Sequence, residues 1–496
     1  MNKHKKYSLL IIVIFAILLK LPYITNPISD WHSWNQITTM ASARYIAKDG
    51  VSSFFNAKVD LFENIKSDSN STYAELPILS GLIAVGFNLF GAESEWIARL
   101  IVILFSVLGS IYFYRLVLEE TNEKVANIAI AFYLISPMVW YFHRTVMTDV
   151  IMVNFIIAGL YHFRFWVRQQ NYRSLFFTIL YTAIAALSKA YALYIGIAYL
   201  MLLIEYQGWK KLIRVSNILL LLGTVGPVLS WIYYCQIQMN SGTGGNNLMA
   251  SAGLLGPFSI WVNKVYWLSL LASVGDFTLL VLGFLIVIYT FIRHFKKLIK
   301  VKIVLYWLVS VMFYFLFVRG GNMEHDYYQM PFAAPVIFIA AIGFKQWFYW
   351  LGKKLTKPYY RLCISTIWIL LFIVASKYTY TKASLDMSPV LLGSKIKEFN
   401  QNHKYVLIVD PDSLQRNQAV YYSGAKGWHI RNLPGLKALE KYKNHGAEYI
   451  GINYRTSSVQ SQEKLFLKYN TNLKKIWEGK SKDRYRQAKT LLIYKM

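Results

Sequence analysis

The sequence contains few cysteines, few acidic residues and few charged residues of any kind. Its 496 residues include 2 cysteines and 25 Asp and Glu, and only 16% of the residues are charged whereas 55% are hydrophobic. Two cysteines cannot build a disulfide framework, so we expect Cys235 and Cys363 to be free thiols. Together with a mean hydropathy of +0.34, this composition excludes an ordinary soluble protein and predicts a polytopic membrane protein.

Basic residues are the exception to this scarcity of charge, because 53 Lys and Arg give a formal net charge of +28. They lie mostly in short clusters between apolar segments and in the C-terminal tail. This distribution is typical of membrane topology and not of a nucleic-acid-binding face. We therefore expect no nucleic-acid partner.

Long apolar runs occupy most of the first 382 residues. Runs long enough to cross about 30 Å of hydrocarbon predict an α-helical fold with about eleven transmembrane helices. They cover residues 7–24, 97–118, 125–141, 149–166, 174–188, 190–206, 215–235, 265–292, 303–318, 328–349 and 362–381. The first run is too long for a signal peptide and no small-x-small cleavage site follows it, so we expect a membrane anchor.

The basic clusters fall in alternate loops of this arrangement. With the N-terminus in the cytoplasm, the cytoplasmic loops contain the clusters at 164–173, 210–214, 293–302 and 345–361. The positive-inside rule therefore supports the count and places the loop over residues 25–96 and the tail outside. We predict a multi-pass protein of the plasma or inner membrane, with a transmembrane domain over residues 1–382 and an extracytoplasmic domain over 383–496.

Neither the first external loop nor the tail is featureless. Apolar residues recur at helical spacing over 34–48 and 77–90, which predicts two amphipathic helices in the membrane interface. In the tail, residues 404–410, 447–453 and 489–494 are typical of strands, and the segments around 413–422, 435–445 and 457–469 are typical of helices. The tail is therefore predicted to be a small α/β domain. Its 20 Lys and Arg against 9 Asp and Glu suit either an anionic surface or simple solvation.

Ionisable residues beside the apolar runs collect on the predicted external side, where each is a candidate functional residue. They are Asp30, His32, Glu75, Arg144, Asp149, Lys189, Arg319, Glu324, His325 and Asp326. Glycosyl transfer from a lipid-linked phosphosugar needs this mixture, because a carboxylate takes the acceptor proton and cations hold the phosphate. Aromatic residues beside them, including Trp34 and Tyr327, are candidates for stacking on a sugar.

Each candidate also has a structural interpretation. Asp30 suits the cap of the helix beginning near Trp34, and Arg144 with Asp149 suits an ion pair. Lys189 suits a lysine that extends from a helix end to the interface. Glu75 suits an exposed loop carboxylate, and Arg319 suits a residue at the membrane interface. His325 and Asp326 suit the cap of a helix start, and as two adjacent ligands they are a weak signal for a metal site. The indoles and tyrosines suit an aromatic belt.

Two further motifs carry little weight. Asp410-Pro411-Asp412 has the spacing of a nucleotide-sugar metal site, but the proline suits a tight turn and the tail is predicted to lie outside the cell. The glycine-rich residues 241–247 lack the preceding strand and the following Lys-Ser/Thr of a phosphate-binding loop, so we expect a flexible loop there. We expect no metal and no cofactor.

Five motifs in order resemble the bacterial branch of the protein-O-mannosyltransferase and aminoarabinose-transferase families of the GT-C superfamily. They are Asp-x-His-Ser-Trp-x-Gln at 30–36, Glu-x-Pro at 75–77, Arg-Thr-x-Met-x-Asp at 144–149, Lys189, and His-Asp-Tyr-Tyr-Gln at 325–329. The resemblance implies an inverting transferase with a polyprenyl-phosphate sugar donor. The chain departs from better-known relatives at Trp31, where they have Glu, and at Asn35, where many have Arg.

The resemblance also implies residue roles. Asp30 would be the catalytic base and Asp149 a second acidic residue of the site. Arg144 and Lys189 would contact the donor phosphate, and His325 with Asp326 would line the cavity. We therefore predict transfer of a sugar to a hydroxyl of an extracytoplasmic glycan, lipid or protein. The alternatives are a transporter or flippase of lipid-linked sugars, whose polar groups usually lie near the bilayer midplane, and a non-catalytic scaffold.

Overall fold

A computed structural model describes residues 3–62, 75–238, 255–411, 417–456 and 473–496. The chain divides into two compact units. Residues 1–24, 99–234 and 247–381 form the first, which we call the membrane unit. Residues 25–98, 235–246 and 382–496 form the second, which we call the loop–tail unit because it combines the long loop after the first apolar run, called the first loop below, with the tail.

The membrane unit is helical. Its helices are α1 (Lys3–Leu18), α5 (Glu95–Glu120), α6 (Glu123–Ile135), α7 (Pro137–Phe142), α8 (Thr148–Gln169), α9 (Tyr172–Ser188), α10 (Ile195–Gln207), α11 (Val215–Gln238), α13 (Lys264–Ala272), α14 (Leu282–Leu298), α15 (Lys302–Phe317), α16 (Arg319–Glu324), α17 (Met330–Lys354) and α18 (Lys357–Lys382). By length and apolar character, six helices among the described residues suffice to cross a membrane, or seven if one bent pair counts as a span. The chain is thus a multi-pass membrane protein, and the exact count of eleven stays a prediction.

One predicted span is bent and does not form a single continuous helix. Residues 265–292 are divided between α13 and α14, whose axes differ by 108°. A π-helical turn over Ser273–Thr278 follows α13, and Leu280 and Val281 then take positive φ angles of 55° and 54°. The apolar pattern continues across this break because both sides of it are apolar, so hydropathy alone does not reveal the bend. The predicted span over 125–141 is also divided, since Pro137 begins α7 after α6 has ended at Ile135.

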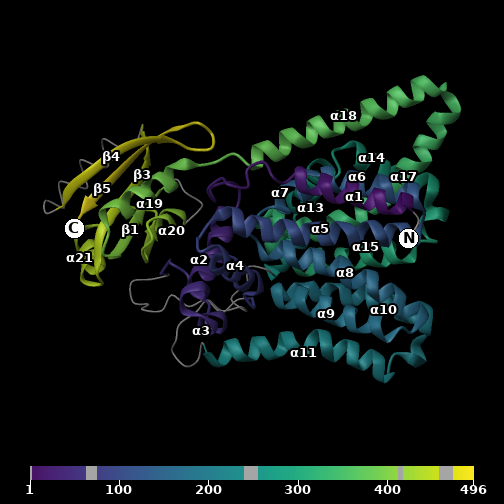
Figure 1. Ribbon diagram of the computed structural model, residues 1–496, viewed down its shortest axis with the longest axis horizontal. Coiled ribbons are helices and arrows are strands. Elements are labelled where there is room, and N and C mark those ends of the chain that lie inside the picture. Colours follow the sequence, from purple (N-terminus) through teal and green to yellow (C-terminus); the bar gives the residue numbers. More distant parts are fainter. Residues whose placement is uncertain (1–2, 63–74, 239–254, 412–416, 457–472) are drawn as a thin grey trace. The chain divides into compact units, whose positions relative to one another are not determined.

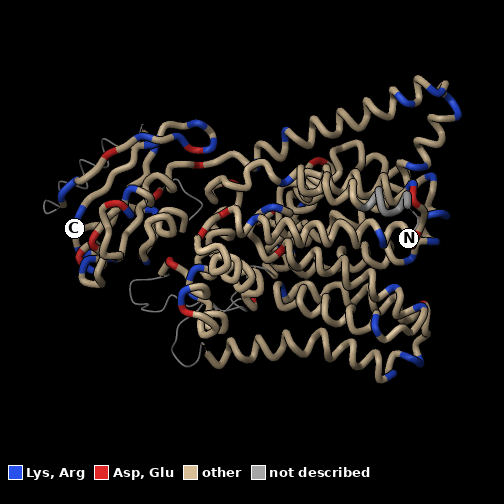
Figure 2. The backbone as a smooth tube through the Cα atoms, in the orientation of Figure 1, with Lys and Arg blue, Asp and Glu red and all other residues tan. Residues whose placement is uncertain are grey.

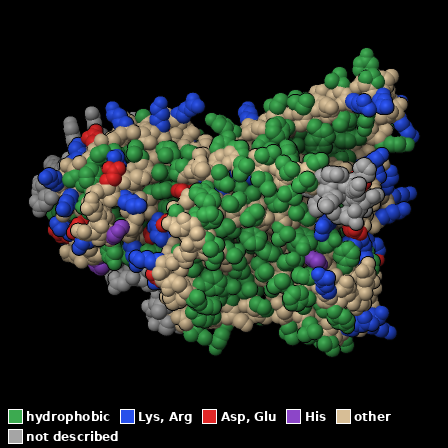
Figure 3. Space-filling model, viewed as in Figure 1, with side chains coloured by type: hydrophobic (Ala, Val, Ile, Leu, Met, Phe, Trp, Pro, Cys, Tyr) green, Lys and Arg blue, Asp and Glu red, His purple; other side chains and the backbone are tan. Residues whose placement is uncertain are grey.

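Burial differs widely among the membrane helices. The most apolar window of α17 is fully buried, whereas those of α11 and α18 are only 22% and 17% buried. Figure 3 shows hydrophobic side chains covering most of the viewed face of the bundle, as expected for a surface that faces lipid. Because α17 is the most buried of these helices, the bundle is packed around it.

Close contact between helices depends on small residues. A Cβ atom on Gly109 of α5 would lie 1.8 Å from Asn154 Oδ1 of α8.

The basic residues of the membrane unit gather at the end of the bundle where the N-terminus lies (Figure 2). This is the distribution that the positive-inside rule requires of loops on one membrane face. The opposite end of the same helices carries Lys189, at the end of α9, and Arg319, at the start of α16. These are among the candidate site residues.

The loop–tail unit contains three helices from the first loop and a five-stranded sheet from the tail. The loop forms α2 (Ser33–Asp49), α3 (Val51–Phe55) and α4 (Ile78–Phe90). The tail forms α19 (Met387–Phe399), β1 (Tyr405–Val409), α20 (Gln418–Tyr422), β2 (Gly427–Ile430), α21 (Leu436–Asn444), β3 (Ala447–Arg455), β4 (Lys474–Lys482) and β5 (Ala488–Lys495). The strand order is β2-β1-β3-β5-β4, with β1 parallel to both neighbours and β5 antiparallel to both of its own.

The first loop contributes to the edge of this sheet. Leu61 forms a parallel bridge with Gly427, the Phe62 amide donates to the Gly427 carbonyl at 2.8 Å, and the Gly427 amide donates to the Asp60 carbonyl at 3.0 Å. Phe62 also packs in the apolar layer that includes Trp428. The loop is therefore part of the tail's fold.

The helices predicted over 34–48 and 77–90 are confirmed as α2 and α4, and the three predicted strands are confirmed as β1, β3 and β5. The helix predicted near 435–445 is α21, and α20 lies within the segment predicted around 413–422. The helix expected over 457–469 and the glycine-rich loop at 241–247 lie outside the described residues. Both cysteines are free, as predicted.

Candidate functional site

The predicted site residues are divided between the two units. Asp30, His32, Trp34 and Glu75 belong to the loop–tail unit, and the others belong to the membrane unit: Arg144, Asp149, Lys189, His325, Asp326 and Tyr327. Within the loop–tail unit, polar contacts surround Asp30. Within the membrane unit, they surround Asp149.

Asp30 is a buried carboxylate held by its own loop. Only 1% of it is exposed, and its Oδ1 accepts a hydrogen bond from Gln36 Nε2 at 2.8 Å. The N-cap position of α2 is occupied by His32, whose φ of 57° is left-handed and whose side chain makes no capping hydrogen bond. His32, and not Asp30, therefore occupies the N-cap position of α2. The contact between Gln36 and Asp30 was not identified from the sequence.

The tail holds the segment around Asp30 from the other side. Arg484, between β4 and β5, donates from its guanidinium to the Asp30 carbonyl at 3.2 Å. Its Cζ atom lies 5.4 Å from the centre of the Trp31 ring, and Lys382 Nζ lies 3.9 Å from the same ring centre. The Trp31 amide donates to the Lys382 carbonyl at 3.2 Å. Trp31 is thus contacted by two cations, and hydrogen bonds from the tail hold the backbone at Asp30 and Trp31.

The start of α2 is bound to α20 of the tail. Asn417 Nδ2, at the N-cap of α20, donates to the Trp34 carbonyl at 2.8 Å and to Thr38 Oγ1 at 3.1 Å. Gln418 donates to the Ser33 hydroxyl. These bonds join positions almost 400 residues apart and hold the backbone at the start of α2. The Trp34 side chain on this turn is half-buried. Glu75, also partly exposed, lies just before α4.

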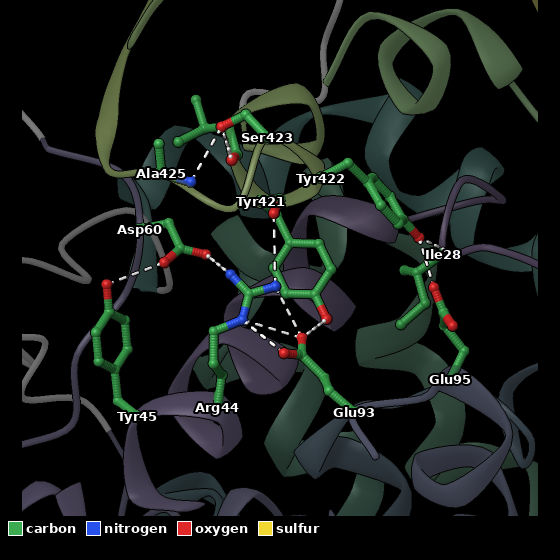
Figure 4. Close-up of polar contacts among 11 residues, drawn as sticks. Ile28, Arg44, Tyr45, Asp60, Glu93, Glu95, Tyr421, Tyr422, Ser423 and Ala425 are labelled. Atoms are coloured by element: carbon green, nitrogen blue, oxygen red, sulfur yellow. Dashed lines mark hydrogen bonds and ion pairs between the residues drawn. The ribbon is translucent and has the colours of Figure 1, made fainter. Parts of the chain in front are cut away.

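An ionic network centred on Arg44 completes the loop–tail unit (Figure 4). The Arg44 guanidinium lies 2.9 Å from Asp60 Oδ2 and 2.7 Å from Glu93 Oε1, and it stacks over the Tyr421 ring at 4.1 Å. The Tyr421 hydroxyl donates to Glu93 at 2.6 Å. A cation from α2 therefore joins two carboxylates of the first loop to α20.

The electrostatics of this network follow from burial. Burial raises the pKa of Asp60 to about 6, against the opposing effects of the Arg44 charge and the Tyr45 hydrogen bond. Burial also acts to raise the pKa of Glu93, but the hydrogen bonds and charge supplied by Arg44 and Tyr421 hold that pKa below its usual value. Arg44 thus compensates two carboxylates, which explains why they tolerate burial.

In the membrane unit, Asp149 lies in the first turn of α8 and is fully buried. Lys189 Nζ lies 3.7 Å from its Oδ2, and the Tyr191 hydroxyl donates to its Oδ1. Lys189 is itself 8% exposed. Its side chain is therefore directed to a buried carboxylate, unlike a lysine that extends into the interface.

Aromatic rings connect this pair to the predicted residues after α16. The Tyr191 ring lies 5.5 Å from the Tyr328 ring, Tyr328 lies 4.7 Å from Tyr327, and Tyr327 stacks on His325 at 5.2 Å with 12° between the planes. The structure thus brings Asp149, Lys189, Tyr327 and His325 into one contiguous cluster. Asp326 begins the short 3-10 helix that carries Tyr327.

Arg144 is buried among aromatic rings. Its guanidinium lies 5.2 Å from the Tyr23 ring and 5.0 Å from the Tyr141 ring. The fully buried Arg99 donates to the carbonyls of Tyr23 and Ile24, each at 3.0 Å. The chain is therefore held by two arginines where it leaves the first helical segment. Tyr23, Tyr191 and Arg99 were not identified from the sequence, because an aromatic ring or an arginine within an apolar run has no distinguishing motif.

Other sequence candidates have structural roles. Arg319 donates to the carbonyls of Pro257 at 3.0 Å and Gly256 at 2.7 Å, so it holds the segment before α13. Asp410 of the Asp-Pro-Asp motif is buried and accepts from Asn453 Nδ2 at 2.7 Å; Asp412 is outside the described residues. Across the described part of the chain, no group of three or more His, Cys, Asp or Glu side chains is arranged to hold a metal ion.

Comparisons with known proteins point to one fold. Residues 75–234 match the family model described as dolichyl-phosphate-mannose-protein mannosyltransferase. ArnT from Cupriavidus metallidurans bound to undecaprenyl phosphate superposes with a TM-score of 0.63 at 12% identity, covering 98% of this chain and 97% of that one. The oligosaccharyltransferase of Archaeoglobus fulgidus superposes with a TM-score of 0.56 at 12% identity, covering 91% and 70%.

A third solved structure, the mycobacterial arabinofuranosyltransferase AftD, superposes with a TM-score of 0.53 at 10% identity and covers 98% of this chain but 41% of that one. None of the curated proteins matches the sequence. At 10–12% identity these structures show a similar fold only. The roles of individual residues are therefore argued from their contacts and their chemistry.

Proposed function

We propose that this chain, a membrane protein with the fold of the GT-C glycosyltransferases, moves a sugar from a polyprenyl-phosphate carrier to a hydroxyl of an extracytoplasmic acceptor. The acceptor is a cell-envelope glycan, a lipid or a protein. The observation that carries the proposal is Asp30, a buried carboxylate oriented by Gln36 in a loop that the tail holds in place. A carboxylate held in this way is suited to general-base work.

In the proposed reaction, the Asp30 carboxylate takes the proton of the acceptor hydroxyl while the hydroxyl oxygen attacks the anomeric carbon. The bond between that carbon and the phosphate oxygen breaks, and the phosphate leaves with the electron pair. Attack opposite the leaving group inverts the anomeric centre. The reaction consumes no metal or redox cofactor, since proton transfer and charge stabilisation suffice.

The proposed reaction also requires cations at the leaving phosphate. We assign Lys189 and Arg144 to the donor phosphate, because a leaving phosphate gains negative charge that fixed cations stabilise. Asp149 orients the Lys189 amine across 3.7 Å. His325 and Tyr327, which stack on each other, are assigned with Asp326, His32, Trp34 and Glu75 to contacts with donor or acceptor. Support for the donor class comes from ArnT, whose structure contains undecaprenyl phosphate.

The test is an assay of the purified full chain with a panel of polyprenyl-phosphate sugars, scored by release of the lipid phosphate. Asp30→Asn keeps the shape of the side chain and its contact with Gln36 but removes the base, so turnover should fall about 100-fold or more. Donor binding, measured separately, should persist.

The matched control is Asp49→Asn. Asp49 is a partly exposed carboxylate of the same loop, paired with Lys58 at 3.0 Å, and its loss should leave turnover unchanged. Normal turnover in Asp30→Asn would exclude Asp30 as the base. Sugar movement across a bilayer without release of lipid phosphate would favour a flippase instead.

A further inference from the structure

A lysine-rich cavity opens in the membrane unit, apart from the polar cluster around Asp149. Its volume is about 690 Å³, and it lies where α6, α14, α17 and α18 meet. Four lysines line it, together with Tyr349 and Tyr360: Lys124, Lys297, Lys345 and Lys353. The last residues of α14 and α17 and the first residues of α6 and α18 contribute to the lining. Basic residues gather at this end of the bundle (Figure 2).

The cavity carries positive charge that the protein does not neutralise. No carboxylate lines it. Lys297 Nζ donates to the neutral Gln346 at 2.7 Å, and Lys353 Nζ lies 4.7 Å from the centre of the Tyr349 ring. Within the described ranges, none of the four side-chain amines forms an ion pair, and the amines of Lys124 and Lys345 have no hydrogen-bond partner. A concave surface of this charge favours an anion.

Helix dipoles explain the positions of only two of these four lysines. Lys297 and Lys353 lie in the last turns of α14 and α17, where a cation is stabilised by the partial negative charge of the helix end. Lys124 lies in the first turn of α6, and Lys345 lies within α17. The first turn of a helix disfavours a cation and favours an anion. The dipole of α6 therefore does not account for Lys124, and Glu123 in the same turn already supplies a negative charge at this helix end.

The apolar lining indicates what kind of anion fits. Ile128, Phe348 and the tyrosines line the cavity beside the lysines. Next to Tyr360, Tyr359 and Leu362 of α18 are 65% and 64% exposed, as expected of a helix face that contacts lipid. A phospholipid matches this combination, since its phosphate suits the amines and its glycerol and acyl chains suit an apolar wall.

We propose that this cavity binds the headgroup of an anionic phospholipid, with the phosphate held by Lys124 and Lys345 and the remainder lying against Tyr349 and Tyr360. The four cations outnumber the charge of one phosphodiester, so anionic headgroups are preferred over zwitterionic ones. This site is independent of the glycosyl-transfer proposal, because none of its residues belongs to that machinery.

The experiment compares lipid binding by native mass spectrometry of the full-length purified protein. Phosphatidylglycerol, phosphatidylcholine and inorganic phosphate are offered separately. The wild type should bind phosphatidylglycerol about tenfold more strongly than phosphatidylcholine, and the double variant Lys124→Gln/Lys345→Gln should lose most of that preference. The control Lys210→Gln/Lys211→Gln removes the same charge from the α10–α11 connection, outside the cavity, and should retain the preference.

Gly352→Leu tests the cavity without altering charge. A Cβ atom on Gly352 would meet the Tyr360 ring at an ordinary 3.5 Å, so the helix accepts a side chain there while the cavity becomes smaller. Binding of phosphatidylglycerol should fall, with thermal unfolding in phosphatidylcholine unchanged.

Equal losses in the cavity and control double variants would overturn the proposal in favour of a diffuse basic surface. Full binding by Gly352→Leu would show that the lipid lies elsewhere. Inorganic phosphate that displaces the lipid, or binds as strongly, would identify a free anion site and overturn the lipid assignment.

Discussion

The two units of this protein are stabilised by different kinds of contact. In the membrane unit, helices that follow one another along the chain pack closely, as α8 and α9 do, and Gly109 permits near contact of α5 with α8. The loop–tail unit has apolar layers as well, but it also contains polar contacts between residues far apart in the sequence: Arg484 to Asp30, Gln418 to Ser33, and Arg44 to Glu93. Lipid surroundings leave little room for polar contacts, whereas an aqueous domain has many.

The same difference governs how each unit accommodates buried charge. The membrane unit places Lys189 beside Asp149, with a hydrogen bond from Tyr191. The loop–tail unit instead shares Arg44 between Asp60 and Glu93 and adds hydrogen bonds from Tyr45 and Tyr421. A contact within a small, fully buried group should be more costly to lose than one within a partly solvated network.

Lys189→Met should therefore cause the largest loss of stability. It leaves the fully buried Asp149 without the Lys189 charge, and removing one partner of a buried pair costs about 3 to 5 kcal/mol. Thermal unfolding in detergent measures the effect, and glycosyl transfer should be lost with it. Lys189→Arg, which keeps the cation, is the control; equal destabilisation by both variants would mean that shape and not charge matters there.

Arg44→Met should cost less, about 2 to 3 kcal/mol, because it leaves Asp60 buried but Glu93 partly exposed. Limited proteolysis should detect a loosened first loop. The control is Lys58→Met, since Lys58 and Asp49 form a pair with side chains about one-third exposed, which is worth less than about 1 kcal/mol. A larger loss for Arg44→Met than for Lys189→Met would reverse the comparison between the units.

Gly427→Ala tests the contact between the first loop and the sheet edge. A Cβ atom at Gly427 would lie 2.0 Å from the Val406 carbonyl oxygen, so β1 and β2 must move apart at a cost of about 2 kcal/mol. Thermal unfolding and proteolysis of the first loop should both register the change. Gly435→Ala is the control, because nothing lies within 4 Å of its Cβ position; equal effects would exclude close approach as the reason for glycine at 427.

Arg484→Gln should have the smallest effect on stability and a clear one on turnover. It removes the cation from Trp31 and the bond to the Asp30 carbonyl, contacts worth about 1 kcal/mol. We expect a several-fold lower kcat with KM and thermal unfolding almost unchanged, because the carboxylate is less well positioned. Arg486→Gln, in the same hairpin, is the control. Unchanged kcat in Arg484→Gln would mean that the tail does not position the loop.

Prediction from the sequence succeeded where structure follows local periodicity. The amphipathic patterns became α2 and α4, and apolar runs in the tail became β1, β3 and β5. It missed β2, which has only four residues, and β4, none of whose residues is fully buried. It did not reveal the bend within residues 265–292, because a bend between two apolar helices leaves no trace in hydropathy.

In the candidate site, too, some residues were identified from the sequence and others were missed. The resemblance selected Asp30, Asp149 and Lys189, and the structure shows both carboxylates to be buried, each with a hydrogen-bond donor. Gln36, Tyr191 and Arg484 were missed. A glutamine, a tyrosine or an arginine is common on any surface, and only its position relative to a carboxylate gives it a role.

By itself, the sequence determined that the chain is a multi-pass helical membrane protein, that its basic residues gather at one end of the bundle, and that a small α/β domain follows. These depend on composition and on periodicities of a few residues. Only the tertiary structure decided that the first loop folds with the tail, that Arg484 and Lys382 contact Trp31 beside the proposed base, and that four lysines share a cavity. Such contacts join positions up to about 450 residues apart, and their energies depend on burial and distance, which no local pattern encodes.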